Sequence, residues 1–112
     1  VELLLFDANA DRGAAWAQYE LGLCHYKGKG ADQSFEQAVK WTTKAAEQGH
    51  INAQFSVAEC FRDGEGVAKS IREAAGWFAK AAAQGDDEAR GLLTECLQHL
   101  RQERAQSQEP HV

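Results

Sequence analysis

The chain has little of several features that mark other classes of protein. Its 112 residues include one proline, no methionine and three cysteines. No run approaches the roughly 18 apolar residues of a transmembrane helix, so we expect no membrane insertion. Basic residues are not in excess either, because 12 Lys and Arg against 17 Asp and Glu leave a net charge of −5. A nucleic-acid-binding surface needs positive charge to displace counterions, so we expect no nucleic-acid partner.

The beginning of the chain lacks the features of a targeting segment. Its first apolar residues are too few for a signal peptide and have no basic residues before them. Because the chain does not begin with methionine, we expect a fragment or a processed chain. A signal upstream of Val1 therefore stays open, and the compartment is unknown, with a lean towards the cytoplasm.

The sequence contains a repeat of 36 residues. Residues 17–52 and 53–88 share 13 identities in 36 positions, whereas about two would be expected from average residue usage. The matching pairs include Ala17 and Ala53, Cys24 and Cys60, Gly28 and Gly64, Ser34 and Ser70, and Trp41 and Trp77. The chain is therefore built from repeated structural units.

Each unit has the pattern of two helices. The first helix is predicted at about 15–27, because Ala17, Leu21 and Cys24 recur at helical spacing on one face. Gly28 ends this helix, since glycine accepts the left-handed backbone that follows a helix end. Ser34 is a suitable N-cap for the second helix.

The repeats define the domain organisation. Full repeats are predicted at about 15–50 and 51–86, with half repeats at 2–12 and 87–104. A single hairpin cannot bury its apolar face, whereas stacked copies can, so we expect an all-α solenoid over residues 1–104. The polar residues 105–112 are predicted to be a flexible tail.

The order of residues within each unit resembles the Sel1-like repeat. The segments that carry the likeness are AQYELGLCHYKGKG with AVKWTTKAAEQGH, and AQFSVAECFRDGEGV with AAGWFAKAAAQGD. Asp32 and Ala68 stand where that family commonly has proline. The resemblance implies a right-handed α/α solenoid that acts as a scaffold or adaptor for protein segments, and it implies no catalytic residues.

The cysteines occupy one position in successive units. Stacked helices lie about 8–10 Å apart, whereas a disulfide needs Cα atoms within roughly 4.4–6.8 Å, so Cys24, Cys60 and Cys96 are not expected to pair. The pattern favours buried structural thiols, with a reactive thiol or a metal ligand as the alternatives. His25 adjoins Cys24, but Phe61 and Leu97 fill its position in the other units. We therefore interpret this position as part of the core.

Candidate binding residues lie on the opposite face of the first helix of each unit. In tetratricopeptide-like solenoids this helix lines the concave groove, so the resemblance places partner binding there. The candidates are Trp16, Tyr19, Glu20, Leu23, Lys27, Asn52, Phe55, Ser56, Glu59 and Asp63. Alternatively, Tyr19 and Phe55 pack between successive helices. The acidic members favour a basic partner segment.

These observations predict a non-enzymatic protein–protein interaction scaffold. We expect no metal, because the remaining histidines show no ligand spacing. We expect no cofactor, because the Gly-x-Gly turns lack the preceding strand and the third glycine of a dinucleotide-binding site. The apolar N-terminal helix is a candidate surface for self-association. The alternatives are a thiol-dependent or cell-wall-acting hydrolase and a purely structural spacer within a larger solenoid.

Overall fold

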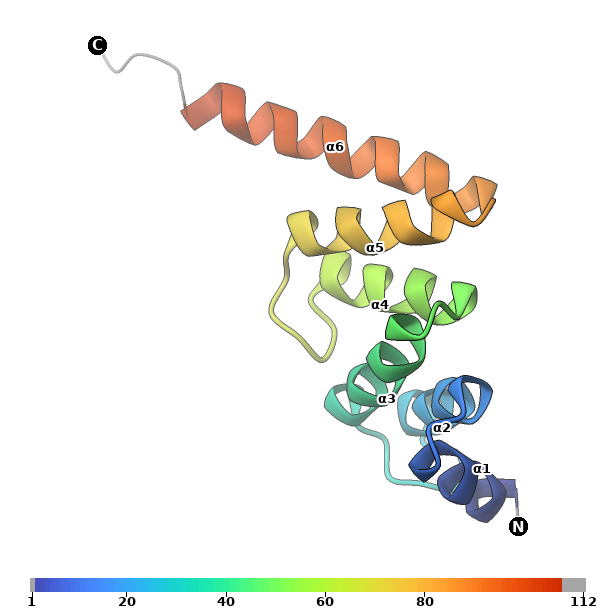
Figure 1. Ribbon diagram of the computed structural model, residues 1–112. Helices are drawn as coiled ribbons and strands as arrows, with labels where there is room; N and C mark the ends of the chain where they lie inside the picture. Colours follow the sequence, from blue (N-terminus) through green and yellow to red (C-terminus); the bar gives the residue numbers. More distant parts are fainter. Residues whose placement is uncertain (1, 108–112) are drawn as a thin grey trace.

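The computed structural model describes residues 2–107, which form six α-helices and no strand (Figure 1). The helices are α1 (Glu2–Asp11), α2 (Ala15–Lys27), α3 (Phe35–Glu47), α4 (Ile51–Asp63), α5 (Ile71–Ala83) and α6 (Asp87–Ser107). Each helix packs against its neighbours in the chain, which produces a single stack. The radius of gyration is 16.1 Å, against about 13 Å for a compact chain of this length. The predicted all-α solenoid is confirmed.

The ends of the helices follow the repeated sequence signals. Gly28 and Gly64 have φ angles of 70° and 73°, and each donates its N–H to the carbonyl four residues earlier. The hydroxyls of Ser34 and Ser70 each accept the N–H three residues later at 3.2 Å. The predicted helix stops and N-caps are therefore confirmed, and α2 spans the predicted residues 15–27.

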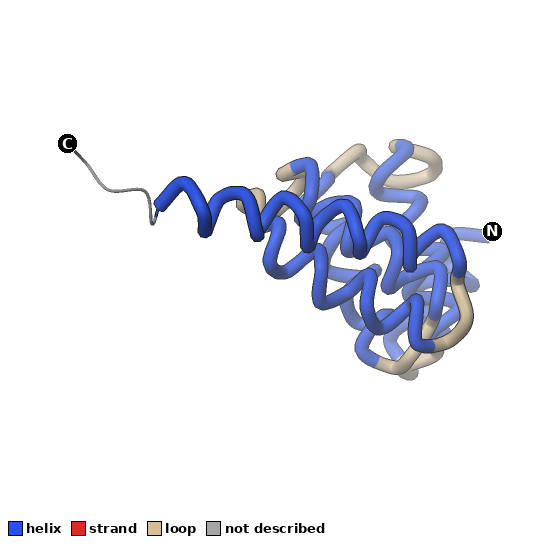
Figure 2. The backbone as a smooth tube through the Cα atoms, turned by 90° about the horizontal axis from the view of Figure 1, so that it is seen from above, coloured by secondary structure: helices blue, strands red, loops and turns tan. Residues whose placement is uncertain are grey.

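The last helix continues beyond the stack. In Figure 2, the C-terminal part of α6 projects past the other helices. This helix begins with the predicted half repeat and runs to Ser107, so the predicted flexible tail starts inside it. Residues 108–112 lie outside the described residues. No helix within residues 2–107 has the length and apolar content needed to cross a membrane.

Two pairs of repeated glutamines connect the two helices of each unit to each other and to the end of the preceding unit. Gln48 donates to the side-chain oxygen of Gln18 at 2.8 Å, and Gln84 donates to that of Gln54 at 2.9 Å. Each donor also reaches a glycine carbonyl 35 residues earlier. Gln18 and Gln54 are only 5% exposed, and each donates to a carbonyl eight residues earlier. These contacts explain why the glutamines recur in both units.

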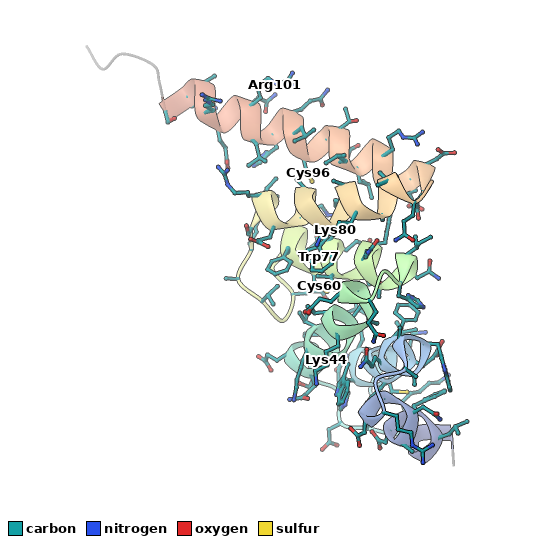
Figure 3. All side chains as sticks on the ribbon, in the orientation of Figure 1. Lys44, Cys60, Trp77, Lys80, Cys96 and Arg101 are labelled. Carbon is teal, nitrogen blue, oxygen red and sulfur yellow. The ribbon has the colours of Figure 1, made fainter. Side chains whose placement is uncertain are left out.

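A repeated Trp–Lys pair lies on the second helix of each unit. The Lys80 ammonium lies 4.4 Å from the centre of the Trp77 ring (Figure 3). In the first unit, the Lys44 ammonium lies 4.5 Å from the centre of the Trp41 ring. Such cation–π contacts each contribute about 0.5–1 kcal/mol at exposed sites. The recurrence of these residues is therefore explained by packing within each unit.

Candidate functional site

A cleft of about 260 Å³ lies where α2, α3 and α4 meet. Five of the predicted groove residues line it: Leu23, Lys27, Ser56, Glu59 and Asp63. The other lining residues, which the sequence analysis did not select, are Gly22, Tyr26, Ala38, Thr42, Cys60 and Glu65. The structure thus brings half of the predicted residues together and adds a base supplied by α3.

Small residues form the base of the cleft. A Cβ atom at Gly22 would collide with the hydroxyl of Thr42 and lie 3.1 Å from the carbonyl oxygen of Ala38. Glycine therefore permits the close approach of α2 to α3 at this point. Thr42 is 6% exposed, and its hydroxyl donates to the Ala38 carbonyl at 2.6 Å. The base is therefore lined by the small residues Gly22, Ala38 and Thr42, and the Thr42 hydroxyl already donates a hydrogen bond.

Acidic side chains border one side of the cleft. The carboxylate of Asp63 accepts hydrogen bonds from Arg62 at 3.0 and 3.2 Å, and these bonds lower the pKa of Asp63. Glu59 lies 3.7 Å from Arg62, and partial burial raises the pKa of Glu59. Tyr26 donates its hydroxyl to Glu65 at 3.2 Å, and the charge of Glu65 raises the tyrosine pKa. Asp63 is therefore the best paired of the three carboxylates.

The cysteines are thiols on successive first helices, and Figure 3 marks Cys60 and Cys96 on α4 and α6. Burial, with the nearby charge of Glu65, raises the pKa of Cys60 to about 11. Burial also raises the pKa of Cys96. The thiolate is the nucleophilic form, so these two thiols are poorly suited to covalent chemistry near neutral pH. Among the described residues, no group of three His, Cys, Asp or Glu side chains could hold a metal ion.

Two of the three aromatic groove candidates, Tyr19 and Phe55, pack between helices. Tyr19 stacks on His50 with ring centres 4.7 Å apart, and Phe55 meets Phe78 edge to face at 5.4 Å. His50 also caps α4, because its Nδ1 accepts the Ala53 N–H at 3.1 Å. Both aromatics are half-buried, so packing takes up much of the surface that they could offer to a partner.

The remaining groove candidates lie away from the cleft. Trp16 is 48% exposed and touches Phe6 of α1 edge to face, with ring centres 6.1 Å apart. Glu20 is half-buried and Asn52 is exposed. None of these residues lines the cleft, so they can contribute only to a wider surface around it.

The position shared by His25, Phe61 and Leu97 is only partly a core position. His25 and Phe61 are half-buried, whereas Leu97 is 45% exposed. The core interpretation is wrong for Leu97, because no helix within the described residues follows α6 to cover it. A second hollow, of about 800 Å³, forms on this face. Its lining residues are Arg72, Leu97, Leu100, Arg101, Glu103, Arg104 and Ser107.

Comparison with known families agrees with the repeat and the fold. The family model of the Sel1 repeat matches residues 17–50 and 51–86. The chain belongs to the Sel1 repeat family. Proteins of the Sel1 repeat family are generally protein-interaction scaffolds. A comparison with curated proteins gives no match.

Solved structures of Sel1 repeat proteins superimpose well on this chain. A Sel1 repeat protein from Oxalobacter formigenes is 36% identical, with a TM-score of 0.79, over 81% of this chain and 37% of that one. A protective antigen of uropathogenic Escherichia coli is 34% identical, with a TM-score of 0.78, over 83% of this chain and 20% of the antigen. Cysteine-rich protein B of Helicobacter pylori shares the fold at 21% identity and a TM-score of 0.78, over 81% of this chain and 68% of that protein. The chain therefore spans well under half the length of the first two proteins.

Proposed function

We propose that this Sel1 repeat chain is a non-catalytic scaffold that binds a segment of a partner protein across α2 and α4. The observation that carries the proposal is the cleft, where Leu23, Lys27, Ser56, Glu59 and Asp63 lie together. Ligand-binding surfaces are typically concave and largely apolar, with a few polar groups that give specificity. The small apolar base and the charged border of this cleft fit that description.

The proposal is tested with linear peptides selected from a random phage-displayed library on the folded chain. Ser56→Arg adds a long charged side chain at the border of the cleft. Gln37→Arg adds the same charge at an exposed position of α3 that does not line the cleft. We expect Ser56→Arg to weaken peptide binding at least tenfold and Gln37→Arg to leave it within about twofold. Equal binding by both variants would show that the peptides bind elsewhere.

The two alternative functions predict other outcomes. The raised pKa of Cys60 supports a scaffold rather than a hydrolase that depends on the thiol in the cleft. A hydrolase would lose its activity on alkylation of a single cysteine. A purely structural spacer would select no peptide, although its helicity and melting temperature would be those of a folded solenoid.

Self-association remains a separate part of the proposal. Leu5 of α1 is 54% exposed, which leaves a large apolar side chain uncovered at one end of the stack. A second copy could bury this side chain.

A further inference from the structure

The two junctions between units differ in the residues that fill them. Thr42 and Ser56 line the cleft at the first junction, where α2, α3 and α4 meet. Thirty-six residues later, Phe78 and Leu92 occupy the same positions of the repeat. Phe78 is fully buried in the core formed by α4, α5 and α6, and Leu92 packs against that core. Two small polar residues thus replace two large apolar ones at the first junction only.

This replacement explains why the first junction is hollow. Close packing fills the interior of a protein, so the loss of two large side chains leaves space unless the helices move together. At Gly22, α2 already lies so close to α3 that a Cβ atom there would collide with the Thr42 hydroxyl. The space therefore remains as a cleft that opens to the surface between α2 and α4.

We propose that this cleft receives one arginine side chain of the partner segment. The inference rests on the proposed binding function and specifies the chemistry of the anchoring residue. Three carboxylates and one lysine line the cleft, so its lining carries a net charge of −2. Complementary charge gives specificity to an interface, and it favours a cationic side chain here.

The carboxylates differ in their capacity to accept this cation. Asp63 is already held by two hydrogen bonds from Arg62. Glu59 has only a 3.7 Å contact with Arg62, and Glu65 accepts a single tyrosine hydroxyl. Carboxylates accept several hydrogen bonds each, so Glu59 and Glu65 have positions left for a guanidinium group.

The rest of the cleft suits the uncharged part of an arginine side chain. Leu23 and Ala38 offer apolar surface against which its methylene groups can pack. Tyr26 is 39% exposed and offers a ring for the planar guanidinium. A partner with an acidic anchor would bring like charges together at the border.

The test uses peptides selected on the wild-type chain from the random phage library. We expect the bound peptides to share an arginine at one fixed position. Replacement of that arginine by citrulline keeps the shape and removes the charge, and it should weaken binding about tenfold or more. Thr42→Phe and Ser56→Leu each copy the filled second junction, and each should weaken binding by a similar factor. Circular dichroism melting establishes that each variant is folded.

The possible outcomes separate the inference from the proposed function. If no peptide binds the wild-type chain, both the binding function and the arginine site are refuted. If peptides bind but tolerate citrulline, or if their shared anchor is acidic or aromatic, only the arginine site is refuted. Undiminished binding by folded Thr42→Phe and Ser56→Leu would likewise place the arginine outside this cleft. Should Thr42→Phe fail to fold, Ser56→Leu at the partly exposed border decides the question.

Discussion

The buried glutamines provide a prediction about how the units are held together. Gln54→Met keeps the length and helical preference of the side chain but removes its amide. The change eliminates the 2.9 Å hydrogen bond from Gln84 and the 3.1 Å hydrogen bond to the carbonyl of Ala46. We therefore expect Gln54→Met to destabilise the chain more than replacement of an exposed glutamine.

The magnitude follows from the partners that remain. Gln84 keeps its hydrogen bond to the Gly49 carbonyl. The Ala46 carbonyl still accepts a hydrogen bond from the Gly49 N–H. No partner loses every hydrogen bond, so the cost is that of two ordinary hydrogen bonds, about 2 kcal/mol in the free energy of unfolding. This corresponds to a fall of about 10 °C in the melting temperature of a domain this size.

Urea and thermal unfolding, followed by circular dichroism, measure this difference. Gln37→Met is the matched control, because Gln37 is exposed on α3. We expect the control to stay within about 0.5 kcal/mol of wild type. If Gln54→Met also falls within about 0.5 kcal/mol, the glutamines do not contribute to stability as we infer from their burial and hydrogen bonds.

Three further predictions concern other parts of the molecule. Ser70→Ala removes the N-cap of α5 and should lower the free energy of unfolding by about 1 kcal/mol in urea melts. Cys60 should react slowly with iodoacetamide at pH 8, where a pKa of about 11 leaves roughly a thousandth of the thiol ionised, and faster as the pH rises. Leu5→Glu should abolish any self-association that sedimentation velocity detects at high protein concentration.

Each of these predictions has a contrary result. Ser107→Ala is the control for the cap, because Ser107 is exposed near the end of α6, and equal effects would refute the role of Ser70. Rapid labelling of Cys60 at neutral pH, read by peptide mass spectrometry, would contradict the slow reaction and support the alternative of a thiol-dependent hydrolase. A wild-type chain that sediments as a monomer at every concentration, or association that Leu5→Glu leaves unchanged, would remove α1 as the self-association surface.

The repeated positions made most of the fold predictable from the sequence. Ser34 and Ser70 cap helices in the structure, and Gly28 and Gly64 end them, because these local signals act within a few residues of the chain. The role of the repeated Gln18 was not predicted. Its hydrogen bonds join parts of the chain that only the stacking of helices brings together.

The candidate site was only half predictable for a related physical reason. Helical spacing placed Leu23 and Glu59 on faces that line the cleft, but it could not show that α3 supplies the base of the cleft. The available signal was a difference between the repeats, with Thr42 at the position of Phe78. Tyr19 shares the predicted face, yet it stacks on His50 rather than lining the cleft, because neighbouring units cover part of that face.

The cleft between α2 and α4 is the proposed binding site of the partner segment. The most direct measurement is a chemical-shift titration of the isotope-labelled chain with a peptide selected on it. We expect the largest amide shifts in residues 22–27 and 56–65, around the cleft. Shifts concentrated instead at Leu97, Leu100 and Arg101, which line the second hollow, would contradict this binding site.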